Sequence, residues 1–176
     1  RSVSFQGAVM AETEETFQVT PTKFIYGGEA LARLPDGRAV FVPYALPDEE
    51  VRIRVTEDKE RYARGEIVEV LDPSPERTEP TCLHFGRCGG CHYQHMPYPA
   101  QLQAKENILQ DQLQRIGGLS NPPVRETVPS PSPWHYRNHI QFHVTESGEL
   151  GYKEFRSDRI FAVQECHLPE EVIDLI

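Results

Sequence analysis

The stretch EEVRIRVTEDKERYARGEIVEVL, residues 49–71, contains two runs in which apolar and polar residues alternate. Alternation with a period of two is typical of a β-strand that has one buried face. The polar segment DKER, residues 58–61, separates the two runs, so together they predict a hairpin. This hairpin is the centre of an all-β unit.

Three more alternating runs precede the hairpin, and turn signals such as Gly27-Gly28 and Pro35-Asp36-Gly37 separate them: TFQVTPTKFI (16–25), EALARL (29–34) and AVFVPYA (39–45). Five short strands within residues 12–72 predict a small closed barrel of the OB type, in a chain that is mainly β. Such barrels commonly bind nucleic acid. The alternative is a barrel that only packs against a neighbouring domain, because a fold alone does not fix a function.

Residues 73–176 predict a second, small α+β domain. The proline-rich segment 72–80 ends the barrel, and apolar residues at helical spacing predict one amphipathic helix over 99–116, with Leu102, Leu109, Leu113 and Ile116 on its apolar side. A linker with five prolines follows at 120–133. Three alternating runs then predict an antiparallel meander: 135–146, 148–155 and 158–166.

The two ends of the chain have unusual features. Residues 1–7, RSVSFQG, lack an initiating Met and resemble what remains after a tag is cleaved, so residues 1–11 are left out of the fold prediction. The last residues, EEVIDLI, are an uncapped helix-like run, which is how an excised fragment would end and which would make a second helix. No apolar run is long enough to span a bilayer, so we expect a cytoplasmic protein without a membrane partner. The sequence leaves the oligomeric state open.

The segment CLHFGRCGGC, residues 82–91, holds three of the four cysteines, and 74 residues separate it from Cys166. In a reducing compartment such a cluster is more typical of metal ligands than of disulfides. Three thiols in one segment with one distant thiol favour a [4Fe-4S] cluster over zinc, whose four-cysteine sites usually comprise two close pairs. Zinc and uncoordinated thiols remain the alternatives. The predicted ligands are Cys82, Cys88, Cys91 and Cys166.

The net charge of −9 argues against loose binding to a polyanion, because that attraction depends on Lys and Arg displacing counterions. Any contact with RNA must therefore be local. The predicted RNA-binding residues lie on one strand face, at the next hairpin and after the linker: Arg52, Arg54, Lys59, Arg61, Arg64, Arg137 and His139. The alternative for each is an ordinary solvated surface residue.

These residues resemble the TRAM-containing branch of the S-adenosylmethionine-dependent RNA uridine-C5 methyltransferases, which includes the 23S ribosomal RNA (uracil-5-)-methyltransferases. The resemblance covers almost the whole chain after the first residues. It is carried by GEALARLPDGRAVFVPYALPDEEVRIRVTEDKERYARGEIVEVL, by CLHFGRCGGCHYQH with YPAQLQAK after it, and by WHYRNHIQFHV and LGYKEFRSDRIFAVQECHL. The cysteine pattern, followed by Tyr98, Gln101, Leu102 and Lys105, is its most specific part.

The resemblance implies that residues 12–72 are a TRAM domain and that the four cysteines bind a [4Fe-4S] cluster in a central domain. It also implies that RNA is the partner, with 23S ribosomal RNA as the first target and transfer RNA as the other. Catalysis and S-adenosylmethionine binding belong to a later domain in this family, so no catalytic or S-adenosylmethionine-binding residue is assigned here. The alternative function is a stand-alone RNA-binding iron–sulfur or zinc adaptor without enzymatic activity.

Overall fold

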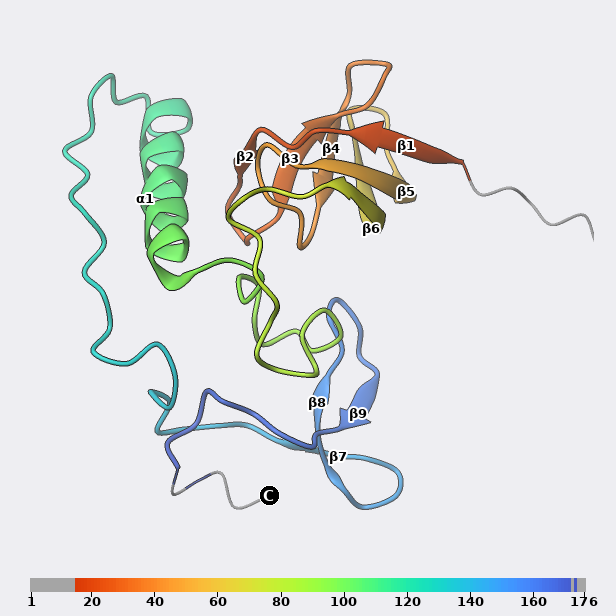
Figure 1. The fold of residues 1–176 in the computed structure, drawn as a ribbon, viewed down its shortest axis with the longest axis vertical. Helices are drawn as coiled ribbons and strands as arrows, with labels where there is room; N and C mark the ends of the chain where they lie inside the picture. The colour runs from red at the N-terminus through yellow and green to blue at the C-terminus, as the bar shows by residue number, and fades with distance from the viewer. Residues whose placement is uncertain (1–14, 172, 174–176) are drawn as a thin grey trace, which may run out of the picture.

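The computed structural model describes residues 15–171 and residue 173 (Figure 1). Within them lie two β-sheets and one helix, so the predicted mainly-β fold with at least one helix is confirmed. The first sheet contains six strands, β1 (Thr16–Val19), β2 (Lys23–Phe24), β3 (Ala30–Arg33), β4 (Ala39–Val42), β5 (Glu50–Asp58) and β6 (Tyr62–Asp72). The expected tag remnant at 1–11 lies outside the described residues.

The first sheet is open, and in this respect the predicted closed barrel of five strands is wrong. Its strand order is β1-β5-β6-β4-β3-β2, and no pairing joins β1 to β2 among the described residues. Both edge strands come from the single predicted strand at 16–25, which is interrupted at Pro21. Proline has no backbone N–H, so it cannot continue a ladder of hydrogen bonds. The sheet therefore curls into a partly open barrel whose two edges belong to consecutive stretches of chain (Figure 1).

The long hairpin of β5 and β6 forms as the alternation predicts. The two strands pair antiparallel, and Ile53 opposite Ile67 places apolar residues on the same face. β6 also pairs in parallel with β4, so it lies between β5 and β4 in the sheet. The core under this face consists of small and branched apolar residues that are almost completely buried, among them Val40, Val42, Val51, Ile53 and Ala63.

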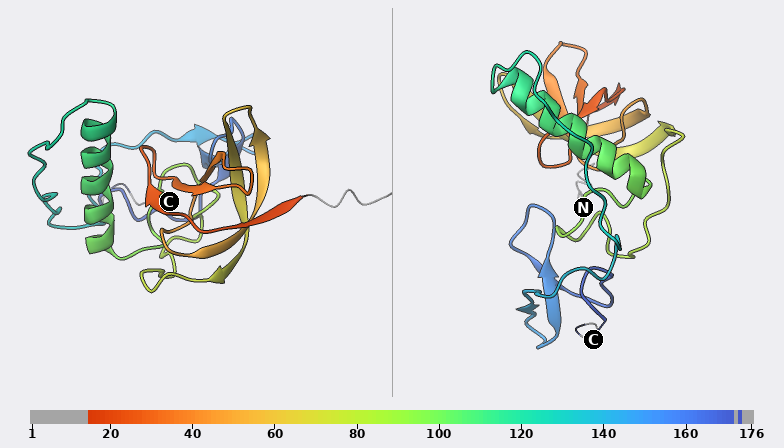
Figure 2. Two further views of the ribbon diagram at one scale, coloured as in Figure 1. Left: turned by 90° about the horizontal axis from the view of Figure 1, so that it is seen from above. Right: turned by 90° about the vertical axis from the view of Figure 1, so that its left-hand side faces the viewer.

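The helix α1 (Tyr98–Arg115) matches the prediction at 99–116 within one residue at each end. Its apolar stripe is only partly covered, because Leu109 is 50% exposed and Ile116, which follows the helix, is 70% exposed. α1 lies beside the barrel, where Asp111 forms an ion pair with Lys23 of β2 (Figure 2). Chain 116–134 then returns along the helix to the second sheet.

The second sheet is the predicted antiparallel meander, which is confirmed with shorter strands. It consists of β7 (His143–Val144), β8 (Leu150–Lys153) and β9 (Ile160–Ala162) in that order. Gly151 of β8 lies so close to Phe161 of β9 that a Cβ atom there would collide with the Phe161 carbonyl oxygen.

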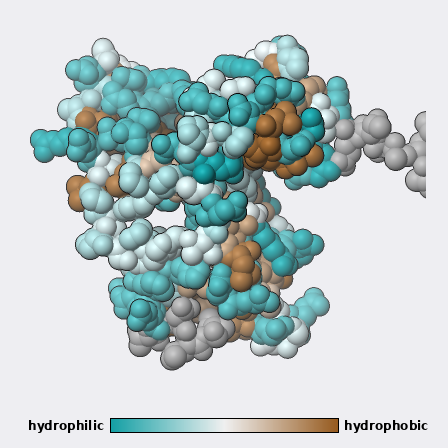
Figure 3. All heavy atoms as spheres, viewed as in Figure 1, coloured by the Kyte–Doolittle hydropathy of each residue, from teal (hydrophilic) through white to brown (hydrophobic). Residues whose placement is uncertain are grey.

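The barrel packs against the cysteine-containing segment and the β8–β9 hairpin. Tyr44, two residues after β4, places its ring 5.0 Å from the ring of Phe85 and 5.4 Å from that of Phe155. In the barrel, Glu29 accepts ion pairs from Arg64 of β6 and from Arg156 of the hairpin, each at 2.6 Å. The face shown in Figure 3 is mostly hydrophilic, with small hydrophobic groups over both parts.

Candidate functional site

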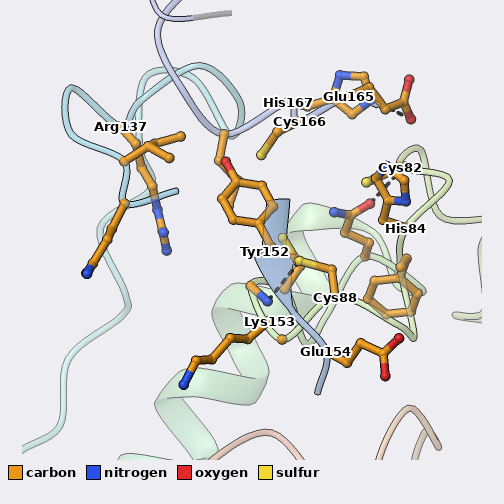
Figure 4. Close-up of a pocket in the computed structure, with 18 of the residues that line it drawn as sticks. Cys82, His84, Cys88, Arg137, Tyr152, Lys153, Glu154, Glu165, Cys166 and His167 are labelled. Atoms are coloured by element: carbon orange, nitrogen blue, oxygen red, sulfur yellow. Dashed lines mark hydrogen bonds and ion pairs between the residues drawn. The ribbon is translucent and has the colours of Figure 1, made fainter. Parts of the chain in front are cut away.

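All four cysteines line one cavity of about 440 Å³ between the 82–91 loop and the meander (Figure 4). Cys82, Cys88 and Cys91 come from the loop, and Cys166 comes from the chain that follows β9. None of the four is in a disulfide. The structure therefore brings together the residues that their spacing in the sequence predicts as one ligand set.

Backbone hydrogen bonds hold the cysteine loop on itself and against the meander. The N–H of Cys88 donates to the carbonyl oxygen of His84 at 2.8 Å, which makes a tight turn. Gly89 donates to the carbonyl oxygen of Lys153, and Phe155 donates to that of Arg87, so the loop extends the end of β8. The cysteine loop thus forms one side of the cavity, and the meander forms the other.

His84 and Glu165 hold the loop to the segment that carries Cys166. His84 is buried, and its Nε2 accepts a hydrogen bond from the N–H of Gln164 at 3.0 Å. This bond requires Nε2 to be unprotonated, in agreement with burial, which lowers the pKa of His84. The carboxylate of Glu165 accepts a hydrogen bond from the N–H of Leu83 at 2.9 Å. His84 is therefore a supporting residue beside the cysteines.

Tyr152 lies in the middle of the cavity, although no pattern in the sequence singles it out. Its ring extends from β8 toward Cys166 (Figure 4). The hydroxyl is buried and makes no hydrogen bond of normal geometry among the described residues. Burial, and after it the neighbouring Cys166 sulfur, raise the pKa of Tyr152. A buried O–H donor beside sulfur is the kind of group that can support a metal-bound sulfur ligand.

The thiols are in an environment that favours their neutral form. Burial raises the pKa of Cys82, Cys88 and Cys91, and neighbouring cysteines raise each of them further. A buried cluster of thiols becomes a set of thiolates only where a positive centre offsets their mutual repulsion. Bound metal supplies such a centre.

Four thiols are a ligand set of the kind that a [4Fe-4S] cluster takes. Within residues 15–171 and 173, no three Cys, His, Asp or Glu side chains converge as ligands of one ion. A tetrahedral zinc site needs its sulfurs about 2.3 Å from a common centre. A [4Fe-4S] cluster instead takes one thiolate at each of four irons, so its ligands surround a larger body. Four cysteines around one cavity match that requirement, and the cluster itself stays a prediction.

Several of the predicted RNA-binding residues of the barrel are in ion pairs. Arg52 pairs with Glu69 and Arg54 pairs with Glu66, in both cases across the β5–β6 ladder. Arg64 pairs with Glu29 and lies over the ring of Phe41, 5.6 Å from its centre. Lys59 contacts Glu57 at 3.2 Å, whereas exposed Arg61 has no ion pair or hydrogen bond among the described residues.

Arg137 and His139 lie beside the cysteines. Both residues are exposed and both line the cysteine cavity. Arg137 is positioned by its backbone N–H, which donates to the carbonyl oxygen of Leu168, and by a bridge to Pro169. The structure thus joins these two residues to the predicted metal ligands, with which the sequence had not grouped them.

The comparison with protein families identifies the barrel. Residues 10–68 match the family model described as the TRAM domain. No helix among the described residues is long and apolar enough to cross a membrane.

Relatives and one solved structure extend the comparison to the residues that follow the barrel. A protein of Halalkalibacterium halodurans named as an RNA methyltransferase is 38% identical, over 92% of this chain and 36% of the relative. Another from Aquifex aeolicus is 35% identical, over 92% of this chain and 37% of the relative. The Pyrococcus abyssi tRNA (uracil-54, C5)-methyltransferase, solved with S-adenosyl-L-homocysteine, aligns with a TM-score of 0.56 and 26% identity, over 88% of this chain and 33% of its own.

The chain spans about a third of the length of the curated relatives it matches. Both the TRAM match and the relatives agree with the resemblance that the cysteine and barrel motifs carry. The chain therefore contains a segment that matches the TRAM domain and, over about nine-tenths of its length, is similar to part of proteins named as RNA methyltransferases, as its sequence predicts.

Proposed function

We propose that this chain is the RNA-recognition and [4Fe-4S]-binding part of an S-adenosylmethionine-dependent RNA methyltransferase that acts on C5 of uridine. The observation that carries the proposal is the cavity in which four cysteines lie beside Arg137 and His139. The TRAM match supports RNA binding. Uridine C5 and S-adenosylmethionine are supported by the solved relative, a tRNA (uracil-54, C5)-methyltransferase with S-adenosyl-L-homocysteine bound.

Each of the four cysteines would hold one iron through its thiolate. The cluster, when bound, would supply a rigid cross-link and no electron, because methyl transfer from S-adenosylmethionine to carbon needs no redox step. Such a link would join the 82–91 loop to Cys166 across the proline linker, where closure of a long loop is entropically costly. The chain's own residues would then keep Arg137 and His139 at the rim, where they can contact RNA phosphate.

The methyl transfer itself is assigned to residues outside this chain. Relatives are about three times as long, which leaves room in them for a separate domain that binds S-adenosylmethionine. Residues 12–72 would act as the TRAM barrel and residues 73–176 as the central iron–sulfur domain, in a cytoplasmic enzyme. The proposed target is 23S ribosomal RNA, and the solved relative makes transfer RNA the second candidate.

The first experiment is an anaerobic purification of the 176-residue chain, followed by its visible absorption spectrum and analysis of iron and sulfide. We expect a brown protein with about four irons per chain, which is the content of one cubane cluster. A colourless protein with one zinc per chain would contradict the iron–sulfur assignment.

A second experiment tests whether this chain binds RNA without itself transferring the methyl group. The chain is incubated with labelled S-adenosylmethionine and with ribosomal or transfer RNA that lacks uridine-C5 methylation, and both RNA binding and methyl incorporation are measured. We expect binding without incorporation. Turnover by the chain alone would show that the transfer step lies within it, and absence of binding to either RNA would contradict the recognition role.

A further inference from the structure

A second cavity of about 330 Å³ lies next to the cysteine cavity. It is lined by the first turns of α1, by the segment after Cys91 and by the end of the proline linker. The two cavities share Gly90, Cys91, Gln94 and Leu168 in their walls. We call this cavity the aromatic pocket. Five of its aromatic and polar side chains have no role in the proposed function: Tyr98, Gln101, Lys105, Trp134 and Tyr136.

We propose that the aromatic pocket binds an unpaired nucleobase of RNA, with the adjoining phosphate held at Lys105. The proposal rests on the proposed function in one respect, namely that the chain binds RNA. It adds a specific site and a specific kind of RNA, a single-stranded one, to that function.

The helix side of the pocket is built by sequence spacing. Tyr98, Gln101 and Lys105 are separated by three and four positions, so they lie on one face of α1. The linker is fastened to this face by two hydrogen bonds. The N–H of Ser130 donates to the hydroxyl of Tyr98 at 2.8 Å, and the hydroxyl of Thr127 donates to the Leu102 carbonyl oxygen at 3.2 Å.

The linker side is built by an unusual backbone at His135, whose φ of 55° lies in the left-handed region. Its N–H donates to the His167 carbonyl oxygen at 2.9 Å, and its Nδ1 lies 3.0 Å from the carbonyl oxygen of Pro169. His135 is thus held against the chain after Cys166. The residues on either side of it, Trp134 and Tyr136, both line the aromatic pocket.

The two aromatic side chains are not core residues. Tyr136 is 52% exposed, and the Trp134 ring has the His167 ring as its aromatic neighbour, at 5.8 Å and nearly perpendicular. Aromatic rings that remain open to solvent are the feature on which proteins stack unpaired RNA bases. Stacking tolerates any base, because every base has a π-face.

The polar groups complement a nucleotide. Gln101 uses its Nε2 to donate to the Met96 carbonyl oxygen at 3.1 Å, and its Oε1 makes no hydrogen bond among the described residues. That oxygen is available to accept from a base N–H. Lys105 is exposed and, within the described part of the chain, makes no ion pair or hydrogen bond. In a chain of net charge −9, such a lysine beside aromatic rings matches a phosphate next to a stacked base.

The size of the cavity agrees with this occupant. About 330 Å³ is near the lower end of the range for small-ligand pockets, roughly 300–1,000 Å³. A single base fits such a space, whereas a base that stays paired and stacked in a duplex does not enter it, because it must first be unstacked, which costs free energy.

The test uses the anaerobically purified chain and two fluorescein-labelled RNAs, a hairpin with a uridine-rich loop and a fully paired duplex of the same length. Dissociation constants are measured by fluorescence anisotropy at several salt concentrations. We expect Tyr136→Ala and Trp134→Ala each to weaken binding of the looped hairpin by about 5- to 100-fold. Trp134→Phe should keep most of the affinity, and binding of the duplex should not change. Lys105→Gln should lower the salt dependence by about 0.7 in slope, as expected for one phosphate of a single strand.

Tyr26→Ala is the matched control, since Tyr26 is 79% exposed and lies outside the aromatic pocket. Trp134 is the only tryptophan, so quenching of its fluorescence by the looped hairpin gives a second readout in the unaltered chain. If the wild-type chain binds the hairpin and the Trp134 and Tyr136 variants bind it equally well, the inference is overturned and the proposed function stands. If the wild-type chain binds neither RNA, the proposed function fails and the inference fails with it.

Discussion

The carboxylate of Glu29 in the barrel lies 2.6 Å from the guanidinium of Arg156 in the β8–β9 hairpin, and this ion pair joins the two parts of the chain. Glu29 is almost fully buried and also binds Arg64 of β6 at 2.6 Å. One carboxylate therefore connects a barrel strand to the hairpin whose first strand borders the cysteine cavity.

Replacing this carboxylate should destabilise the junction. Glu29→Gln leaves two guanidiniums facing a neutral amide, so we expect the free energy of unfolding to fall by about 1–3 kcal/mol. Urea denaturation followed by circular dichroism measures it. Asp58→Asn is the control, because Asp58 pairs with Arg38 but is 63% exposed, and we expect a change below about 1 kcal/mol. Equal effects of the two substitutions would argue against a stabilising role for Glu29.

Two glycines near the cysteines should differ sharply in their tolerance of a methyl group. In Gly151→Ala the new Cβ collides with the Phe161 backbone, so β8 and β9 must separate, and we expect a loss of about 2 kcal/mol or more. In Gly89→Ala the nearest atom, the Cα of Phe155, is 3.6 Å away, so this variant should remain within about 1 kcal/mol of the wild type. Thermal unfolding of both variants makes the comparison, and a Gly89 variant as unstable as the Gly151 variant would contradict it.

Stability should depend on pH through His95. This residue is almost fully buried, and burial lowers its pKa to about 4. Because the folded pKa lies below that of the unfolded chain, about 6.5, the contribution is fully present above pH 6.5 and is lost as pH falls toward 4. The wild type should lose on the order of 3 kcal/mol over this window. His95→Phe, which keeps a ring against Phe85, should show a smaller slope in urea denaturation at pH 7, 6 and 5; parallel slopes would exclude His95 as the cause.

Among the four predicted ligands, Cys166 lies furthest from the others in the sequence. If it holds one iron of a cluster, Cys166→Ser should lower the iron content and expose the linker at 120–133 to protease, because the cross-link over the linker is lost. Iron analysis and limited trypsin digestion, which can cut after Arg125, follow both effects. Gln164→Ala is the control, since it removes an exposed side chain but keeps the backbone hydrogen bond to His84. An unchanged spectrum in the Ser variant would remove Cys166 from the ligand set.

The arginines of the barrel should contribute unequally to RNA binding. Arg61 is exposed and makes no ion pair or hydrogen bond among the described residues, whereas Arg52 is paired with Glu69. The ion pair between a guanidinium and a carboxylate must break before that guanidinium can bind an RNA phosphate. We therefore expect Arg61→Ala to reduce the salt slope of RNA binding by about 1, and Arg52→Ala to reduce it less. Anisotropy titrations at several salt concentrations would contradict the idea if Arg52→Ala had the larger effect.

Local patterns in the sequence were enough to predict most of the strands and the helix. The alternation over residues 49–71 predicts β5 and β6, and the spacing of Leu102, Leu109 and Leu113 predicts α1. Both patterns depend only on near neighbours along the chain. The sequence did not predict that the barrel is open, although Pro21 interrupts the predicted strand at 16–25. Whether the two edges of a sheet meet depends on strands that are distant in sequence.

The sequence by itself determined the grouping of the four cysteines, the meander and the resemblance to RNA methyltransferases, since spacing and motif order are properties of the chain alone. Only the tertiary structure decided what surrounds the cysteines. It brought Tyr152 and Arg137 to their cavity, paired Arg52 and Arg54 with carboxylates through the register of β5 against β6, and placed Trp134 and Tyr136 in one pocket with the first turns of α1. The physical reason is that burial, charge pairing and cavity lining depend on long-range contacts, which no local period of the sequence specifies.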